Sequence, residues 1–288
     1  MPTTHLNHFG FLSITGQDAL KFLQGYTTCD VNRLTSHRAG FGAICNIQGR
    51  MVTSFRIVKL DDGLLLRMHR DLVDNTLRFL GKYIVFSKAE MSDMSETYTC
   101  YGGIDAIPGA LHDGELPEHI NDVEVQDTHI LVKISKTIPH YEIWAKQALE
   151  IAGEDLETDT WQQAEIDGGY AWVDASNTEE YIPQMFNYHN LGGIDFEKGC
   201  YLGQEIIARL EYRGKLKQKL HRGNSATRVS SGDELLSADG KAIGSVVNVA
   251  HTGDSYSILT VLQNPEDEPV QATTEGGESV QFKPVDAI

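Results

Sequence analysis

The sequence predicts an α+β protein that is followed by a small antiparallel β-barrel. Over the first 215 residues, short apolar or alternating runs typical of strands are interspersed with short helical patterns. After Leu216 the pattern changes to brief alternating runs with frequent turn residues, which is typical of a small barrel or sandwich. We therefore expect residues 1–215 to form a body of two intertwined α+β lobes and residues 216–288 to form the barrel.

Composition and charge exclude several classes of protein. Hydrophobic residues make up 41% of the 288 residues and charged residues 23%, which is ordinary for a globular protein. No run approaches the roughly 18 apolar residues of a membrane span, and the first residues lack the basic and apolar regions of a signal peptide. The net charge of −17 repels nucleic acid overall, so an RNA contact requires a local basic patch. We expect a cytoplasmic protein with no membrane contact.

The cysteine spacing argues against a resident metal. Cys29, Cys45, Cys100 and Cys200 are far apart and include no C-x-x-C pair. This pattern is unlike a zinc site, a disulfide framework or a four-cysteine iron–sulfur cluster. We expect reduced thiols and no bound metal.

The N-terminal part predicts strands that alternate with short helices. Thr15 is expected to cap a helix that ends at Gly25. Asp61-Asp62-Gly63 is a strong hairpin signal between two strands. The expected strands are 9–14, 41–46, 51–59, 63–68 and 83–86, with a second helix over 71–80.

The middle part predicts a second run of strands, at 98–101, 129–134 and 141–144, and then a helix that ends at Gly153. The acidic, turn-rich stretch from Pro108 to Asp127 is expected to be an exposed loop. Thr160 and Gln163 form a capping-box pattern that places Trp161 in the first turn of a helix ending at Gly168-Gly169. An aromatic side chain in that position can face a cleft.

The stretch KGCYLGQEIIAR, from Lys198 to Arg209, places a cysteine where a helix is expected to start. Its apolar residues recur at near-helical spacing, at Leu202, Ile206, Ile207 and Leu210. We expect the helix to begin between Tyr201 and Gly203, so that unpaired backbone N–H groups, with Lys198 nearby, would lower the pKa of the Cys200 thiol. The alternative is a small buried thiol that closes a turn.

This stretch resembles the signature of the YgfZ-type folate-binding proteins. KGCYLGQE, preceded by IPQMFNYHNLGGIDFEKG, carries the resemblance, and KFLQGYTTCDV and AICNIQGRM resemble two further family segments in the same order. The family is related to the glycine-cleavage aminomethyltransferase, or T-protein, and to mitochondrial iron–sulfur assembly factors; its bacterial members are called tRNA-modifying proteins. The resemblance implies an aminomethyltransferase-like folate-binding body.

The resemblance also implies contacts with tetrahydrofolate or another reduced folate. A flat pterin needs stacking surfaces and a carboxylate or amide that reads its edge. Trp161 matches a folate-contacting tryptophan of the family, and Phe9 falls where relatives carry another tryptophan. Glu179 lies at about the place of a pterin-reading glutamate, with Glu180 as the alternative register. Without the resemblance, each is more simply a core aromatic or a solvated charge.

In the cysteine motif, Cys200 and Lys198 are the candidate catalytic residues. The supporting residues of the motif are Gly199, Tyr201, Gly203, Gln204, Glu205 and Arg209.

One departure from the T-proteins argues against aminomethyl transfer. T-proteins carry an aspartate beside the folate nitrogens, on the strand after an Asn-x-x-Gly turn. Aligned on Asn46 to Gly49, this place reads Thr53-Ser54 here. Neither side chain can act as a carboxylate acid or base near neutral pH.

A basic stretch lies between the predicted body and the barrel. Its cations are Arg209, Arg213, Lys215, Lys217, Lys219 and Arg222. The alternation of Lys215, Lys217 and Lys219 predicts one face of a strand. The stretch is either a solvated strand face that discourages edge pairing or an anion patch for a folate tail, an acidic partner or tRNA, the last through Arg213 and the three lysines.

The favoured hypothesis is a tetrahydrofolate-binding accessory protein that assists assembly or repair of iron–sulfur clusters in client enzymes, including tRNA-modifying ones. The alternative is a folate-dependent one-carbon transferase or tRNA-modifying enzyme that uses Cys200 as its nucleophile. A plain folate-storage module, in which Cys200 is dispensable, is a third reading.

Overall fold

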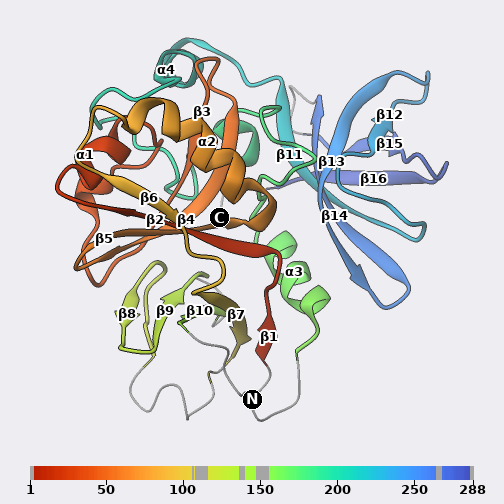
Figure 1. Ribbon diagram of the computed structural model, residues 1–288. Coiled ribbons are helices and arrows are strands. Elements are labelled where there is room, and N and C mark those ends of the chain that lie inside the picture. The colour runs from red at the N-terminus through yellow and green to blue at the C-terminus, as the bar shows by residue number, and fades with distance from the viewer. Residues whose placement is uncertain are drawn as a thin grey trace.

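The computed structural model describes residues 3–105, 107, 116–135, 140–146, 156–263 and 268–285. Two five-stranded antiparallel sheets form the body, and a closed barrel of six strands lies beside it (Figure 1). The predicted fold class is therefore confirmed. In the described ranges, no helix is long and apolar enough to cross a lipid bilayer.

The first sheet has the strand order β3-β4-β5-β2-β6. Its strands are β2 (Phe9–Thr15), β3 (Gly40–Cys45), β4 (Met51–Leu60), β5 (Gly63–His69) and β6 (Glu90–Asp93). Helices α1 (Ala19–Gln24) and α2 (Val73–Ile84) pack apolar side chains against it, in a core cluster that includes Phe22, Phe55 and Leu80. Burial of that cluster is what holds the helices on the sheet.

The second sheet has the order β1-β7-β10-β9-β8. Its strands are β1 (Thr3–His5), β7 (Thr99–Ile104), β8 (Val123–Val125), β9 (His129–Lys133) and β10 (His140–Ala145). Strand β1 precedes the whole first sheet in the chain yet pairs with β7, Thr3 opposite Gly103. The two lobes of the body are intertwined in this sense.

The barrel follows the order β11-β14-β13-β12-β15-β16. Its strands are β11 (Gln218–Ser225), β12 (Glu234–Leu236), β13 (Ala242–Thr252), β14 (Ser255–Gln263), β15 (Val270–Thr273) and β16 (Ser279–Pro284). Pairing of β16 with β11 closes it. Closure removes exposed sheet edges, which are otherwise templates for association with other chains.

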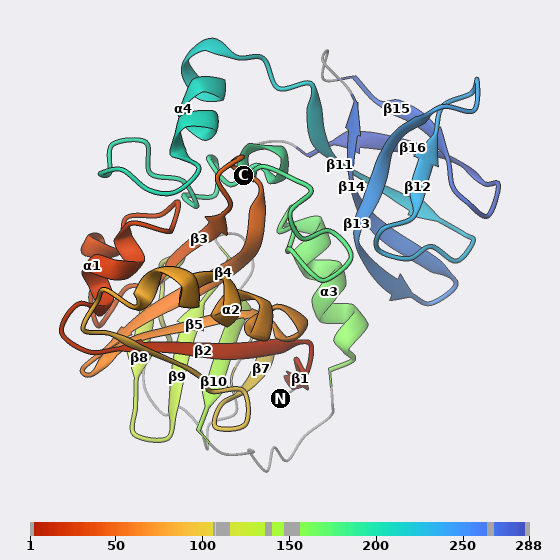
Figure 2. The same ribbon diagram turned by 45° about the horizontal axis from the view of Figure 1, so that its top comes forward.

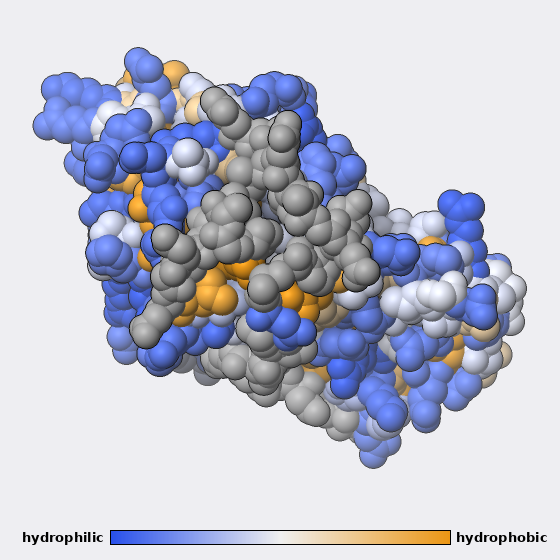
Figure 3. All heavy atoms as spheres, turned by 90° about the horizontal axis from the view of Figure 1, so that it is seen from below, coloured by the Kyte–Doolittle hydropathy of each residue, from blue (hydrophilic) through white to orange (hydrophobic). Residues whose placement is uncertain are grey.

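Helix α3 (Thr158–Asp167) lies between the body and the barrel (Figures 1 and 2). Its buried residues Trp161 and Ile166 belong to one core cluster that also contains Phe9 of the first sheet, Trp144 of the second and Val247 of the barrel. Helix α3 is therefore the element on which all three parts converge. On the face seen from below, hydrophilic residues predominate over the barrel, in keeping with the high charge of the chain (Figure 3).

A buried ion pair joins the two sheets of the body. Arg67 of β5 binds Glu142 of β10 through two hydrogen bonds, of which the Nε to Oε2 bond is 3.0 Å. Arg56 Nε lies 3.7 Å from the same carboxylate, and Trp144 Nε1 donates to it at 2.8 Å. One carboxylate thus faces two guanidinium groups away from water.

Several predicted elements differ from the structure. Residues 83–86 are not a strand, because α2 continues to Ile84 and Tyr83 stacks edge-on against Phe79 one turn earlier. Thr15 ends β2, and α1 begins after Asp18 instead. Helix α3 begins at Thr158, two residues before the predicted cap, and ends before Gly168 as predicted.

Two other predictions fall partly on residues that the structure does not describe. The helix ending at Gly153 lies outside the described residues. Residues 108–115 of the predicted loop from Pro108 to Asp127 also lie outside the described residues, and its described part, residues 116–127, contains the short strand β8.

The Glu142 pair makes a stability prediction. Glu142→Gln leaves two buried guanidinium groups without a compensating charge, so the free energy of unfolding in urea should fall by about 3–5 kcal/mol. Glu96→Gln removes the exposed partner of Arg70 and should change it by less than about 1 kcal/mol. Equal effects of the two substitutions would contradict the structural importance of the buried pair.

Candidate functional site

Two cavities flank helix α3 and share Glu165 and Tyr170 in their walls. Trp161 and Glu165 are four residues apart, so they lie on one side of the helix. The first, the His140 cavity, has a volume of about 90 Å³ and is lined by Trp161, His140 and Ser135 besides the shared residues. The second, the Trp172 cavity, has a volume of about 250 Å³.

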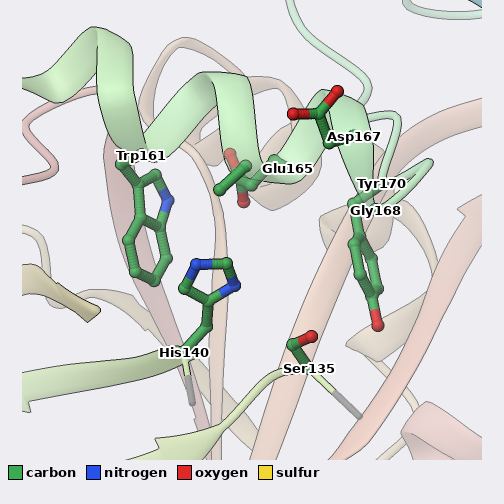
Figure 4. A pocket seen from close by; sticks show the side chains of 8 residues that line it. Ser135, His140, Trp161, Glu165, Asp167, Gly168 and Tyr170 are labelled. Carbon is green, nitrogen blue, oxygen red and sulfur yellow. The ribbon is translucent and has the colours of Figure 1, made fainter. Parts of the chain in front are cut away.

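In the His140 cavity, Trp161 and Glu165 project from α3 toward His140 at the start of β10 (Figure 4). The Trp161 ring is 1% exposed, and its Nε1 has no hydrogen-bond partner in the described part of the chain. The ring packs so closely on Gly102 of β7 that a Cβ there would lie 2.5 Å from it. An unpaired buried donor beside a cavity is costly, which suits a site that a polar ligand completes.

The first sheet, helix α3 and the barrel all contribute to the Trp172 cavity. Phe9 comes from the first sheet, Glu165 from α3, Trp172 from the segment after α3, and Asn248 from barrel strand β13. Asn248 also accepts a hydrogen bond from the backbone N–H of Trp172, at 2.8 Å. The cavity therefore has aromatic walls with a few fixed polar groups, as small-molecule sites do.

Glu165 is the buried acid between the two cavities. Burial raises its pKa to about 7, although Arg67 opposes the shift. Its Oε1 accepts a hydrogen bond from Trp172 Nε1 at 2.9 Å. At neutral pH the carboxyl is therefore divided between its neutral and ionised forms, so it can both donate to and accept from a heterocyclic ligand.

The Arg67 guanidinium stacks on two of the rings that line the Trp172 cavity. The Arg67 guanidinium carbon lies 3.7 Å from the centre of the Phe9 ring and 4.1 Å from that of Trp172. The guanidinium covers part of both rings, so a flat ligand in the cavity would stack on the ring surface that remains. Near Phe9, burial lowers the pKa of His8 to about 3, so that imidazole is neutral at pH 7.

The position of the missing aspartate is occupied by buried hydroxyl residues. Thr53 and Ser54 are fully buried in β4. Ser54 Oγ accepts a hydrogen bond from the N–H of Val173, at 3.0 Å, and Thr53 Oγ1 donates to the carbonyl of Ser54. Both hydroxyl groups bind backbone groups, and neither is a carboxylate acid or base.

The structure does not bring Glu179 near Trp161 and Phe9. Glu179 is exposed in a turn at a positive φ of 60°. Its N–H donates to Met51 at 2.7 Å, and Arg50 donates to the carbonyls of Glu179 and Glu180. Neither glutamate lines the two cavities.

Cys200 lies at the surface, away from the cavities, on a loop that is held by its neighbours. It is exposed, whereas Cys29, Cys45 and Cys100 are buried. Helix α4 (Gln204–Arg213) begins after Gly203, slightly later than predicted, and Gln204 accepts a hydrogen bond from the N–H of Tyr201. Cys200 therefore precedes the helix by several residues.

Lys198 anchors the cysteine loop to the turn after α1. Its ammonium donates to the carbonyls of Gln24, Thr27 and Cys29 at 2.7–2.8 Å and lies 4.9 Å from the centre of the Tyr201 ring. Burial lowers its pKa to about 8. These contacts engage all three N–H donors of the side chain, so Lys198 positions the loop.

The other motif residues divide between anchors and surface. Gly203 has a φ of 83°, and a Cβ there would lie 2.5 Å from the carbonyl oxygen of Asn46. Gly199 has open space around it. Glu205 and Arg209 are exposed on α4. The loop is thus fixed at both ends while its cysteine faces solvent.

The basic stretch does not form one strand face as predicted. Strand β11 begins only at Gln218, where pairing with Gln263 starts, so Lys215 and Lys217 lie in the linker after α4. Lys219 alone of the three lysines is on the strand. Arg213 is the last residue of α4 and is exposed.

Sequence reasoning missed the buried acids and their arginines. Glu165 stands four residues after Trp161, and that helical spacing was the signal that could have identified it. Arg67 and Glu142 are 75 residues apart, and Trp172 is outside every motif used. No local pattern in the sequence predicts such pairs.

Comparisons with known proteins support the resemblance. No family model matches the chain. The protein "tRNA-modifying protein YgfZ" of Yersinia pseudotuberculosis is 28% identical over 280 residues, covering 90% of this chain and 83% of that protein. The protein of the same name from Colwellia psychrerythraea is 29% identical over 298 residues, covering 97% and 92%. The resemblance to YgfZ-type proteins is therefore confirmed.

The fold has a solved counterpart. The crystal structure of the glycine cleavage system aminomethyltransferase T from Bartonella henselae superposes with a TM-score of 0.74, covering 99% of this chain and 85% of that one. At 13% sequence identity the likeness shows the fold alone. The aminomethyltransferase-like architecture expected from the motifs is confirmed.

The pKa of Glu165 predicts a pH effect on stability. A carboxyl with a pKa of about 7 in the folded chain and 4.5 otherwise stabilises the fold below pH 4.5, and this contribution is lost as the pH rises through 7. Glutamine cannot ionise, so the Glu165→Gln variant should not lose this stability as the pH rises. Its free energy of unfolding, minus that of the wild type, should therefore rise by about 3 kcal/mol between pH 4.5 and 8. Glu157→Gln, at the exposed residue that directly precedes the same helix, is the control. Parallel curves for wild type and Glu165→Gln in urea would contradict the assignment.

Proposed function

We propose that this protein binds tetrahydrofolate, or another reduced folate, and acts as an accessory factor in the assembly or repair of iron–sulfur clusters in client enzymes. Its place of action is the cytoplasm. The observation that carries the proposal is that Trp161 and Phe9, selected by family position, line adjoining cavities that share one buried acid.

The chemistry of the cavities supports a pterin ligand. A pterin edge alternates hydrogen-bond donors and acceptors, and Glu165 offers both kinds of group near neutral pH. Phe9 and Trp172 provide aromatic surface for the flat ring. We propose Glu165, in place of Glu179, as the acid that contacts the pterin edge, because Glu179 lines neither cavity.

The absence of a carboxylate at Thr53 and Ser54 supports an accessory role over methylene transfer. No proton acceptor is available there for the transfer step that T-proteins perform. The alternative, a one-carbon transferase or tRNA-modifying enzyme with Cys200 as nucleophile, predicts sustained turnover of labelled methylene-tetrahydrofolate with an amine, thiol or RNA acceptor.

The second half of the proposal concerns Cys200. An exposed thiol on an anchored loop can contact a partner, and Cys200 lines neither cavity beside α3, so the two tasks would use separate residues. One thiolate is not enough to hold a cluster, which usually needs four ligands, so a cluster contact would be completed by the partner protein. The relatives' name, tRNA-modifying protein, fits clients that modify tRNA. A direct tRNA contact would use Arg213, Lys215, Lys217 and Lys219.

Measurements of folate affinity test the proposed folate site. Trp161→Phe keeps the fold and loses the indole N–H and part of the ring, so tetrahydrofolate affinity measured by calorimetry should fall by about 1–3 kcal/mol. Trp144→Phe is the matched control, because Trp144 is also fully buried but lines neither cavity. Unchanged affinity of the Trp161 variant would remove that ring from the site.

Site-resolved alkylation and complementation test the proposed role of Cys200. Burial raises the pKa of Cys29 to about 11 and raises those of Cys45 and Cys100, so Cys200 should react first with iodoacetamide at neutral pH. Cys200→Ser should fail to restore iron–sulfur enzyme activities in a deletion strain while it still binds folate. Cys100→Ser is the control. Full complementation by Cys200→Ser would end the case for a functional thiol.

A further inference from the structure

The end of helix α2 presents two large apolar side chains to solvent. Phe86 is 94% exposed, more than any other large apolar side chain in the described ranges, and Val85 is 68% exposed. The fold therefore makes almost no use of the hydrophobic surface of the Phe86 ring. Exposed apolar side chains that stand together, in particular aromatic ones beside a pocket, mark interaction sites.

Phe86 forms one wall of a pocket between α1 and the end of α2 (Figure 1). We call it the Phe86 pocket; its volume is about 320 Å³, and its other aromatic walls are Phe22, Tyr26 and Tyr83. The centre of the Tyr26 ring lies 5.0 Å from that of Phe22 and 4.9 Å from that of Tyr83. Packed aromatic rings thus line the pocket beside the exposed Phe86 side chain.

The pocket also contains a carboxylate with an acceptor to spare. Asp18 lines the pocket, and its Oδ2 accepts a hydrogen bond from the backbone N–H of Lys88 at 2.8 Å. Its Oδ1 makes no hydrogen bond with the described part of the chain. A tyrosine or tryptophan side chain in the pocket can therefore pack on the aromatic walls and donate its O–H or N–H to Asp18.

Positive charge is concentrated around this pocket, although the chain as a whole has a net charge of −17. Residues 75–89 contain no Asp or Glu. The nearby cations are exposed and form no ion pair within the described ranges; they are Lys21 of α1, which lines the pocket, and Arg78, Lys82 and Lys88. Arg78 and Lys82 are four residues apart, so they lie on one side of α2, and Val85 continues that side. This surface would attract acidic residues.

The pocket adjoins the loop that carries the exposed cysteine. Gly25 lines the pocket, and its carbonyl accepts a hydrogen bond from the N–H of Leu202 at 3.0 Å. The preceding carbonyl, of Gln24, accepts one from the ammonium of Lys198 at 2.8 Å. The loop is thereby held beside α1 (Figure 2), with Cys200 between these two contacts in the chain. A partner in the pocket would therefore lie next to the thiol.

We infer that the Phe86 pocket binds a segment of the client protein that carries a tyrosine or tryptophan among acidic residues, and that this contact brings the client to Cys200. The inference rests on the proposed accessory role of Cys200. The anchor ring packs on Tyr26 and Tyr83, and the acidic neighbours of that ring face the unpaired cations. An anionic membrane would also attract the cations. It would leave the recessed aromatic pocket unfilled, however, so the pocket favours a protein segment.

Fluorescence anisotropy with a short labelled peptide tests the contact. The peptide has one central tryptophan between runs of glutamate, and control peptides carry serine for the tryptophan or lysine for the glutamates. The wild-type protein should bind the first peptide roughly tenfold more tightly than either control at low salt, and Phe86→Ser should remove roughly tenfold of that affinity. Lys21→Gln and Lys82→Gln should each weaken binding by up to about fivefold.

Two matched controls lie on other faces of the molecule. Val125→Ser changes an exposed apolar residue of β8, and Lys241→Gln an exposed cation of the barrel; both should keep the wild-type affinity. Binding that depends on neither the tryptophan nor Phe86 would overturn the inference. Binding to anionic phospholipid vesicles, or self-association in sedimentation, that Phe86→Ser abolishes would assign the surface to a membrane or to a second copy of the chain and would also overturn it.

Complementation separates this inference from the proposed function. In a deletion strain, Phe86→Ser should lower the activities of iron–sulfur enzymes, while its tetrahydrofolate affinity and the alkylation rate of Cys200 stay at the wild-type values. If Cys200→Ser fails to complement and Phe86→Ser complements fully, the inference is overturned and the proposed function stands. Full complementation by Cys200→Ser would overturn the proposed role of the thiol and the inference with it.

Discussion

The carboxylate of Glu142, held between Arg67 and Arg56, is the interaction on which the body depends. It lies between the two sheets, so each sheet supplies charge that the other must balance. One carboxylate cannot fully compensate two guanidinium groups away from water. The faces of the Phe9 and Trp172 rings supply the remaining stabilisation for Arg67, by contact with its guanidinium. The core of the body is thus electrostatic as well as apolar.

That arrangement also shapes the candidate site. Arg67 stacks on Phe9 and Trp172, two residues that line the Trp172 cavity, and Glu165 forms a wall of both cavities. The same arginine opposes the rise in the pKa of Glu165 that burial causes. Charge balance in the core and the protonation state of the site are therefore properties of one network. The cysteine loop is separate, since its anchor Lys198 binds the turn after α1.

Features that depend on neighbouring residues could be predicted from the sequence. Contacts between residues far apart in the chain could not. The hairpins, the end of α3 at Gly168 and the change to short strands in the barrel could be predicted from neighbouring residues. The Trp161 and Cys200 motifs could be identified from short segments. The carbonyls that hold Lys198 are about 170 residues away from it, so its role as an anchor had no sequence signal. Glu179 was selected by its place in the family pattern, with Glu180 as the alternative, and its side chain is exposed to solvent in a turn.

The shared walls of the Trp172 cavity have a consequence for how the molecule holds together. Phe9, Glu165 and Asn248 belong to a sheet, a connecting helix and the barrel, whose buried residues meet in one core cluster. A ligand in this cavity binds only when all three are docked, so by mass action it stabilises their docking in proportion to the logarithm of its concentration. The supply of that ligand would then set how often the barrel separates from the body, and with it how readily proteases reach the linker.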